Sequence, residues 1–177
     1  YLLVRNPMNI HQVSKIELTP DVVDCFVFWT KNPAAMIKRH GDDLQKMQIP
    51  FYFQFTVNPY NKIIEPFVPE KKMVFDTFIS LANLIGKERM IWRYDPIIFT
   101  DTIDFDYHVK YFEVIAQKLA PYTNKCIISF LDFYKKTQRN MQAIPFSDPS
   151  LEQKLELSRT LYTTASELGL KLVTCAE

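Results

Sequence analysis

The chain has 177 residues, of which 47% are apolar, 23% charged and 14% aromatic, and its net charge is +1. This hydrophobicity excludes a disordered chain, and the balanced charge gives no overall signature of nucleic-acid or membrane binding. Only three glycines occur (Gly41, Gly86 and Gly169), which excludes the glycine-rich loops of dinucleotide-binding and P-loop proteins. We expect residues 1–177 to form one cytoplasmic domain with no membrane partner, and the first residue, which is not Met, indicates a fragment of a longer protein.

In chain order, short apolar runs typical of buried strands alternate with amphipathic runs typical of helices. Strands are predicted at Tyr1–Val4, Asp24–Trp29, Phe51–Thr56, Arg89–Arg93, Cys126–Leu131 and Leu170–Thr174, and helices at Pro33–Gln48, Glu70–Ile85, Asp106–Leu119 and Leu151–Leu168. Gly86 and Gly169 follow predicted helix ends, where a left-handed residue closes the last turn, and Gly41 interrupts the first helix.

The dipeptide Asn-Pro occurs at Asn6, Asn32 and Asn58, with a constant spacing of 26 residues. Asn caps helices and Pro suits their first turn, so we interpret the repeat as the junction between strand and helix. Such alternation implies right-handed crossovers and a parallel sheet, in either a (β/α) barrel or a doubly wound fold. Because 177 residues are too few for a full barrel, we predict an α/β fold: a parallel (β/α) partial or truncated TIM-like barrel of five to six strands.

Polar residues follow the end of each predicted strand, and parallel α/β folds carry their active sites at that edge. The candidate catalytic residues are Lys31, Arg93, Asp95, Asp132 and Glu177. The candidate cofactor-binding residues are Asn32, Thr56, Asn58 and Ser129. No His neighbours the serine in this set, so a catalytic triad is not expected.

The chemistry of these candidates leaves alternatives open. Lys31 could be a Schiff-base nucleophile, an anion ligand or half of an ion pair. Arg93 and Asp95 alternate along one strand and share a face, so they form either an ion pair or a contact to substrate. Asp132 and Glu177 are either acid–base groups or loop caps.

The metal-binding residue types are scattered along the sequence. The histidines are His11, His40 and His108, and the cysteines are Cys25, Cys126 and Cys175. None of the histidines follows a strand or stands at ligand spacing from another, so we expect surface or helix positions for them. The cysteines are too far apart to predict a zinc or iron–sulfur site made from this chain alone.

Six short motifs are distinctive: VRNPMN (Val4–Asn9), VFWTKNP (Val27–Pro33), FQFTVNPY (Phe53–Tyr60), WRYDPI (Trp92–Ile97), ISFLDFY (Ile128–Tyr134) and TCAE (Thr174–Glu177). In this order they resemble a bacterial family of a domain of unknown function over nearly the whole chain. Members of that family look related to radical S-adenosylmethionine enzymes, the spore photoproduct lyase branch in particular.

The resemblance implies a (β/α) partial barrel that holds a [4Fe–4S] cluster and S-adenosylmethionine at the carboxyl ends of its strands. The family's cysteine cluster and its N-terminal strand with a Ser-Arg-Arg-Thr-Asp-like motif have no counterpart in residues 1–177, so we expect both cofactors only in the full-length protein. Radical enzymes usually place cluster cysteines in the loop that Thr30, Lys31 and Asn32 occupy here. Thr56 and Asn58 would replace their Gly-Gly-Glu-like strand end, which binds the methionine amino group.

The function predicted from the resemblance is a radical S-adenosylmethionine-like enzyme core that acts on an unknown small molecule or nucleotide. One alternative is a cofactor-independent barrel lyase or hydrolase that uses Lys31 and the carboxylates of the strand ends. The other is a non-catalytic nucleotide-binding or nucleic-acid-binding domain, in which the basic residues Lys135, Lys136 and Arg139 contact phosphate. A solvated helix face would account for the same three residues.

Overall fold

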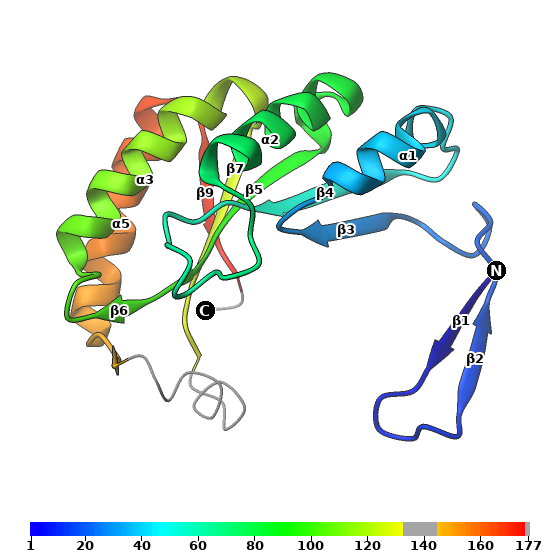
Figure 1. Cartoon of the computed structure of the whole chain (residues 1–177), viewed down its shortest axis with the longest axis horizontal. Coiled ribbons are helices and arrows are strands. Elements are labelled where there is room, and N and C mark those ends of the chain that lie inside the picture. Colours follow the sequence, from blue (N-terminus) through cyan, green and yellow to red (C-terminus); the bar gives the residue numbers. More distant parts are fainter. Residues whose placement is uncertain (133–144, 176–177) are drawn as a thin grey trace.

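The computed structural model describes residues 1–132 and 145–175, and a parallel five-stranded sheet lies at its centre (Figure 1). In spatial order the strands are β3 (Phe26–Thr30), β4 (Phe51–Thr56), β5 (Met90–Ile97), β7 (Lys125–Phe130) and β9 (Lys171–Thr174). Spatial order follows chain order without a reversal, whereas doubly wound sheets reverse theirs. The predicted α/β class and parallel sheet are confirmed, and within the described residues the sheet is open, with β3 and β9 as its edges.

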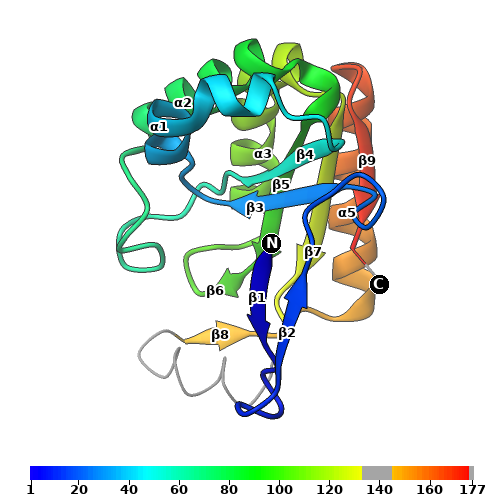
Figure 2. The same cartoon turned by 90° about the vertical axis from the view of Figure 1, so that its right-hand side faces the viewer.

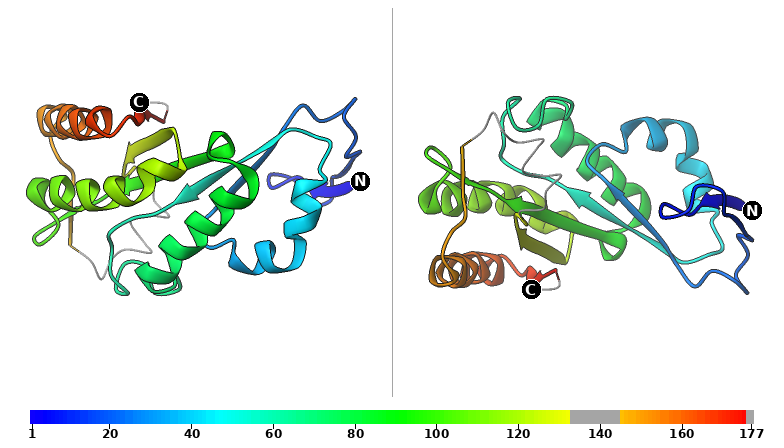
Figure 3. Two further views of the ribbon diagram at one scale, coloured as in Figure 1. Left: turned by 90° about the horizontal axis from the view of Figure 1, so that it is seen from above. Right: turned by 90° about the horizontal axis from the view of Figure 1, so that it is seen from below.

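In the described part of the chain, four α-helices connect the strands and form one layer on one side of the sheet (Figures 1 and 3). They are α1 (Ala34–Gln45), α2 (Lys71–Ile85), α3 (Phe105–Leu119) and α5 (Leu151–Glu167), and each packs against the next in the chain. These helices and the five strands of the sheet lie where the apolar periodicity predicts them.

The core between helices and sheet is largely aromatic. Alternate residues of the strands point into it, and those of β4 and β5 are Phe51, Phe53, Phe55, Met90, Trp92 and Tyr94. Trp92 stacks on Phe112 of α3 with ring centroids 4.9 Å apart, and Phe55 contacts Phe78 of α2 at 5.2 Å. Each such ring buries a large apolar area, so this layer supplies most of the hydrophobic stabilisation of the fold.

The other side of the sheet, which we call the open face, is covered by none of the four helices (Figure 3). It carries Val27, Trp29, Tyr52, Gln54, Thr56, Ile91, Arg93, Asp95, Lys125, Ile127, Ser129, Lys171 and Val173. Buried polar side chains lie toward the carboxyl ends of β4 and β5 (Thr56, Arg93 and Asp95), while none of the residues at the amino ends (Val27, Tyr52, Ile91, Lys125 and Lys171) is buried. The open face therefore has the polar edge that the sequence predicts.

The N-terminal segment forms a separate antiparallel hairpin (Figures 1 and 2). β1 (Leu2–Arg5) confirms the strand predicted near the N-terminus, but it pairs with β2 (Val13–Ile16), which was not predicted, and lies outside the parallel sheet. A second small sheet pairs β6 (Phe99–Thr100) with β8 (Phe146–Ser147), which are too short to leave a sequence pattern.

The Asn-Pro repeat marks a helix start only once. The Asn32 side chain accepts a hydrogen bond from the backbone N–H of Ala34 at the start of α1, but the N-cap of this helix is Pro33, one residue later than the predicted cap. Asn6 instead closes the turn of the hairpin, accepting from the N–H of Met8, and Asn58 faces β5. The interpretation of all three as strand–helix junctions is therefore wrong, because equal spacing does not give equal surroundings.

Two glycines follow helix ends with positive φ, as predicted, although the ψ of 146° at Gly86 lies outside the left-handed helical region. Gly86 and Gly169 follow α2 and α5 with φ of +87° and +73°, a region that other residues enter at a cost. Gly41 lies in α1 beside His40, whose φ of −133° kinks that helix.

Candidate functional site

The carboxyl ends of β3, β4 and β5 bring five of the predicted site residues together. These residues are Lys31, Thr56, Asn58, Arg93 and Asp95. Parallel neighbours end at the same edge, so residues far apart in the sequence meet there. Two residues without a place in the prediction, Gln54 and Glu65, complete the network.

Arg93 and Asp95 form a buried ion pair at the centre of this network. The guanidinium Nε and Nη2 lie 2.8 and 2.5 Å from Oδ2 of Asp95, and Nη1 donates to Oε1 of Gln54 at 2.6 Å. Burial alone would lower the pKa of Arg93, but its hydrogen bonds to Asp95 and Cys175 raise it above the ordinary value. Arg93 is therefore a fixed cation, and the ion-pair interpretation of these two residues is the one that the geometry supports.

Thr56 connects the ion pair to the edge strand. Its hydroxyl donates to Oδ1 of Asp95 at 3.3 Å and accepts from the indole Nε1 of Trp29 at the same distance. Arg93 stacks under the same indole, with its Cζ 4.1 Å from the ring centroid. Thr56 and Arg93 thus hold Trp29 in position.

Asn58 is nearly fully buried, with 2% of its surface exposed, and only half of its amide is satisfied. Its Nδ2 donates to the backbone oxygen of Asp95 at 2.7 Å and to Oε1 of Glu65 at 3.4 Å. These two acceptors fix the orientation of the amide, which leaves Oδ1 buried and without a hydrogen-bond partner among the described residues. A buried acceptor without a hydrogen bond is energetically unfavourable, and a donor on a bound ligand would satisfy it.

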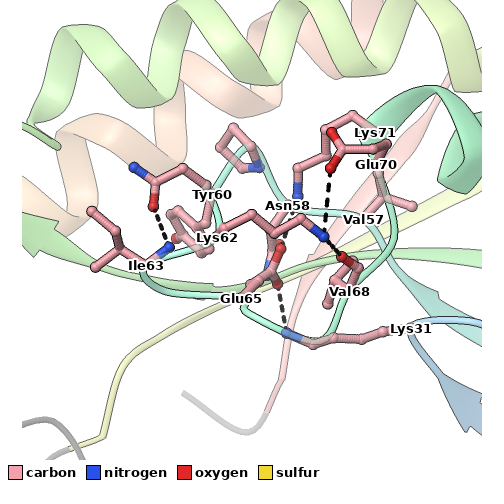
Figure 4. A network of polar contacts seen from close by, with 12 residues as sticks. Lys31, Val57, Asn58, Tyr60, Lys62, Ile63, Glu65, Val68, Glu70 and Lys71 are labelled. Atoms are coloured by element: carbon pink, nitrogen blue, oxygen red, sulfur yellow. Dashed lines mark hydrogen bonds and ion pairs between the residues drawn. The ribbon is translucent and has the colours of Figure 1, made fainter.

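Glu65 forms ion pairs with two lysines at the outer edge of the site (Figure 4). Its carboxylate is buried, and Lys31 and Lys71 approach its two oxygens at 2.7 and 2.8 Å. Lys31 therefore has an ion-pair partner, one of the alternatives left open for it. No sequence pattern points to Glu65, since it lies in a loop without periodicity and its partner Lys31 stands 34 residues earlier.

The loop that carries Glu65 is tied to β5 and to itself. The Tyr60 hydroxyl donates to the oxygen of Pro96 at 2.6 Å and accepts from the N–H of Ile98 at 3.0 Å, and burial raises its pKa well above the usual value. Lys62 donates to the backbone oxygen of Val68 (Figure 4). A pocket of about 170 Å³ opens between this loop and the start of α2, with Glu65 in its wall.

His108 lies on helix α3, as expected, but it is buried rather than exposed. Its Nε2 donates to the backbone oxygen of Ile98 at 2.9 Å, so Nδ1 accepts from the Tyr94 hydroxyl at 2.8 Å. Burial lowers its pKa to about 4, which keeps the ring neutral at physiological pH. Its bond to Ile98, just beyond β5, makes it a structural support for the site.

The remaining predicted residues lie apart from the network. Asn32 is exposed just before α1, where it accepts from the N–H of Ala34, and Ser129 is half-buried on β7 of the open face. Asp132 is exposed and borders a separate pocket beside Lys154 at the start of α5. Glu177 and the basic patch at 135–139 lie outside the described residues.

Neither a cluster of metal-binding side chains nor a membrane-spanning helix is found among the described residues. Across 1–132 and 145–175, no three His, Cys, Asp or Glu side chains are grouped closely enough to hold a metal ion. Within the same ranges, no helix combines the length and apolar character needed to cross a membrane.

A family model for a domain of unknown function, DUF1848, matches the sequence over residues 1–177. The chain belongs to the DUF1848 family. No curated protein and no solved structure matches it. The DUF1848 match covers every residue of the site and confirms a family of unknown function, while the relation to radical S-adenosylmethionine enzymes stays a prediction.

Proposed function

We propose that this DUF1848 domain is the partial (β/α) barrel of a radical S-adenosylmethionine-like enzyme, and that its ligand lies on the open face at the carboxyl ends of the strands. The support is topological and chemical. The strands follow chain order, the four helices of the described residues lie on one side of the sheet, and the buried polar groups gather on the other side. In (β/α) barrels the side of the sheet away from the helices is the interior, and ligands bind at the carboxyl ends.

The observation that carries the proposal is the unpartnered Oδ1 of Asn58. Asn58 follows β4, the second strand of the sheet, which is the position where the resemblance expects a group that binds the methionine amino group. An ammonium group is a hydrogen-bond donor, and a donor is what the buried Oδ1 of Asn58 lacks among the described residues. Asn58 therefore fits the amino-acid end of S-adenosylmethionine, a cofactor whose chemistry is the generation of a radical on the substrate.

The residues present do not fit an iron–sulfur cluster. Such a cluster needs several cysteine thiolates together, and Cys25, Cys126 and Cys175 are not among any metal-binding group of the described residues. In this proposal the cluster ligands come from segments beyond residues 1–177. What this chain contributes is the binding and orientation of the ligand.

Comparison of two ligands tests the role of Asn58. S-adenosylmethionine and 5′-methylthioadenosine share the nucleoside, but only the first carries the amino group. We expect calorimetry to show tighter binding of S-adenosylmethionine, and Asn58→Ala to weaken it about tenfold while changing the affinity for methylthioadenosine less than about threefold.

The exposed Asn83 of α2 provides the control, since Asn83→Ala should change neither affinity. Equal losses for both ligands in Asn58→Ala would mean that Asn58 only supports the fold. Absence of S-adenosylmethionine binding by wild-type protein would overturn the proposal.

A further inference from the structure

Trp29 is exposed and yet held in place. It shows 62% of its surface to solvent on the edge strand β3, although large aromatic side chains usually lie inside. Its indole N–H is bonded to Thr56, and the guanidinium of Arg93 lies against one ring face at 4.1 Å. Arg93 is itself fixed by Asp95 and Gln54. The second ring face is therefore presented outward in a single orientation.

A fixed aromatic ring is a good binding surface, because little side-chain entropy remains to be lost when a ligand stacks on it. The position of Arg93 limits what that ligand is. Since one face of the indole already holds a cation, a second cation on the other face would be repelled by Arg93. A flat, uncharged ring avoids this repulsion and gains the stacking contact.

Gln54 adds a hydrogen-bond donor next to the indole. It is the register partner of Trp29 across β3 and β4, so both side chains stand side by side on the open face. Because its Oε1 accepts from Arg93 at 2.6 Å, its amide nitrogen points away from the guanidinium. No described residue accepts a hydrogen bond from that nitrogen. A ring with an acceptor atom at its edge would satisfy it.

We infer that Trp29 and Gln54 form a subsite for the base of a nucleoside ligand. The base stacks on the free face of Trp29, and a ring nitrogen or carbonyl at its edge accepts from the amide of Gln54. The inference deepens the proposed function by naming the class of the ligand ring, and it rests on the open face being the ligand site. The base belongs either to S-adenosylmethionine or to a separate nucleoside substrate.

Adenosine is the probe, and tryptophan fluorescence gives the first measurement. The only other tryptophan, Trp92, is fully buried in the core, so a ligand on the open face quenches Trp29 selectively. We expect saturable quenching by adenosine and none by ribose. Equilibrium dialysis then gives affinities for variants that lack the indole.

Substitutions at Trp29 and Gln54 test the stacking contact and the hydrogen bond separately. Trp29→Leu should weaken adenosine binding at least about fivefold, whereas Trp29→Phe, which keeps a flat ring, should stay within about threefold of wild type. Gln54→Glu keeps an oxygen for Arg93 but removes the donor, so it should weaken binding about threefold or more. The matched control is Tyr162→Leu, an exposed aromatic on α5, which should have no effect.

Each result decides the inference. Unchanged affinity in Trp29→Leu, or no adenosine binding by wild-type protein, would overturn it. Competition between adenosine and S-adenosylmethionine would assign the base to the cofactor, and simultaneous binding would assign it to a substrate. If adenosine binds through Trp29 while S-adenosylmethionine does not bind, the proposed function fails and the nucleoside subsite stands.

Discussion

Removal of the Asp95 carboxylate should destabilise the fold strongly, because it leaves a buried cation without its counter-charge. The side chains of Arg93 and Asp95 are 3% and 8% exposed, and two guanidinium nitrogens lie within 2.8 Å of one carboxylate oxygen. Breaking a buried ion pair by removal of one partner costs about 3–5 kcal/mol. Thr56 loses an acceptor in the same change. We therefore expect Asp95→Ala to lower the free energy of unfolding by about 4 kcal/mol.

Urea denaturation followed by circular dichroism measures this loss. With a denaturant slope of about 2 kcal/mol per molar urea, the midpoint should fall by about 2 M. The matched control is Asp76→Ala, which breaks an ion pair of similar length: Lys72 and Asp76 lie 2.7 Å apart, but their side chains are 86% and 60% exposed. Its midpoint should hardly move, since solvent screens such pairs. Similar shifts in the two variants would refute the argument that burial decides the effect.

Three further predictions concern the support of the site and the backbone. The pKa of His108 is about 4 in the folded protein and 6.5 in the unfolded chain. As the pH falls, the unfolded chain therefore binds the proton first. The free energy of unfolding should fall by about 3 kcal/mol between pH 6.5 and pH 4. His108→Gln should show a shallower fall in urea midpoint over that range, and a parallel fall would contradict the assignment. Gly169→Ala should lower the free energy of unfolding by about 1 kcal/mol, because φ is +73° there. Gly41→Ala should raise it by about 0.5 kcal/mol, since the added Cβ meets only Leu84 at 3.4 Å in a helix; thermal melts of the two variants should move in opposite directions.

The main elements of the fold could be predicted because their signals are local. Strands such as β4 are continuous apolar runs, and helices such as α2 carry a clear 3.6-residue stripe. The pairing of β1 with β2 could not be predicted in the same way, since four exposed residues in each strand leave no burial pattern. The constant Asn-Pro spacing was misleading for a related reason: a local motif does not say which distant group its side chain meets.

The sequence predicted several of the residues that lie at the candidate site, but not which side chains they contact there. Strand ends placed Thr56, Arg93 and Asp95 correctly, because parallel strands deliver their final residues to one edge. Glu65 was missed, since its role depends on Lys31 and on the path of a loop rather than on any repeat. The exposure of Trp29 was missed as well, because sequence alone does not separate a buried aromatic side chain from an exposed one.

The match between spatial order and chain order has a consequence for how the protein is made. Each strand of the main sheet pairs with the strand of that sheet synthesised just before it. No strand is therefore inserted between two strands that have already been synthesised. β3 and β4 with α1 can pair first, and β5, β7 and β9 then add one at a time to an existing edge. The domain can therefore assemble vectorially during synthesis, with the edge that carries Thr56, Arg93 and Asp95 completed strand by strand.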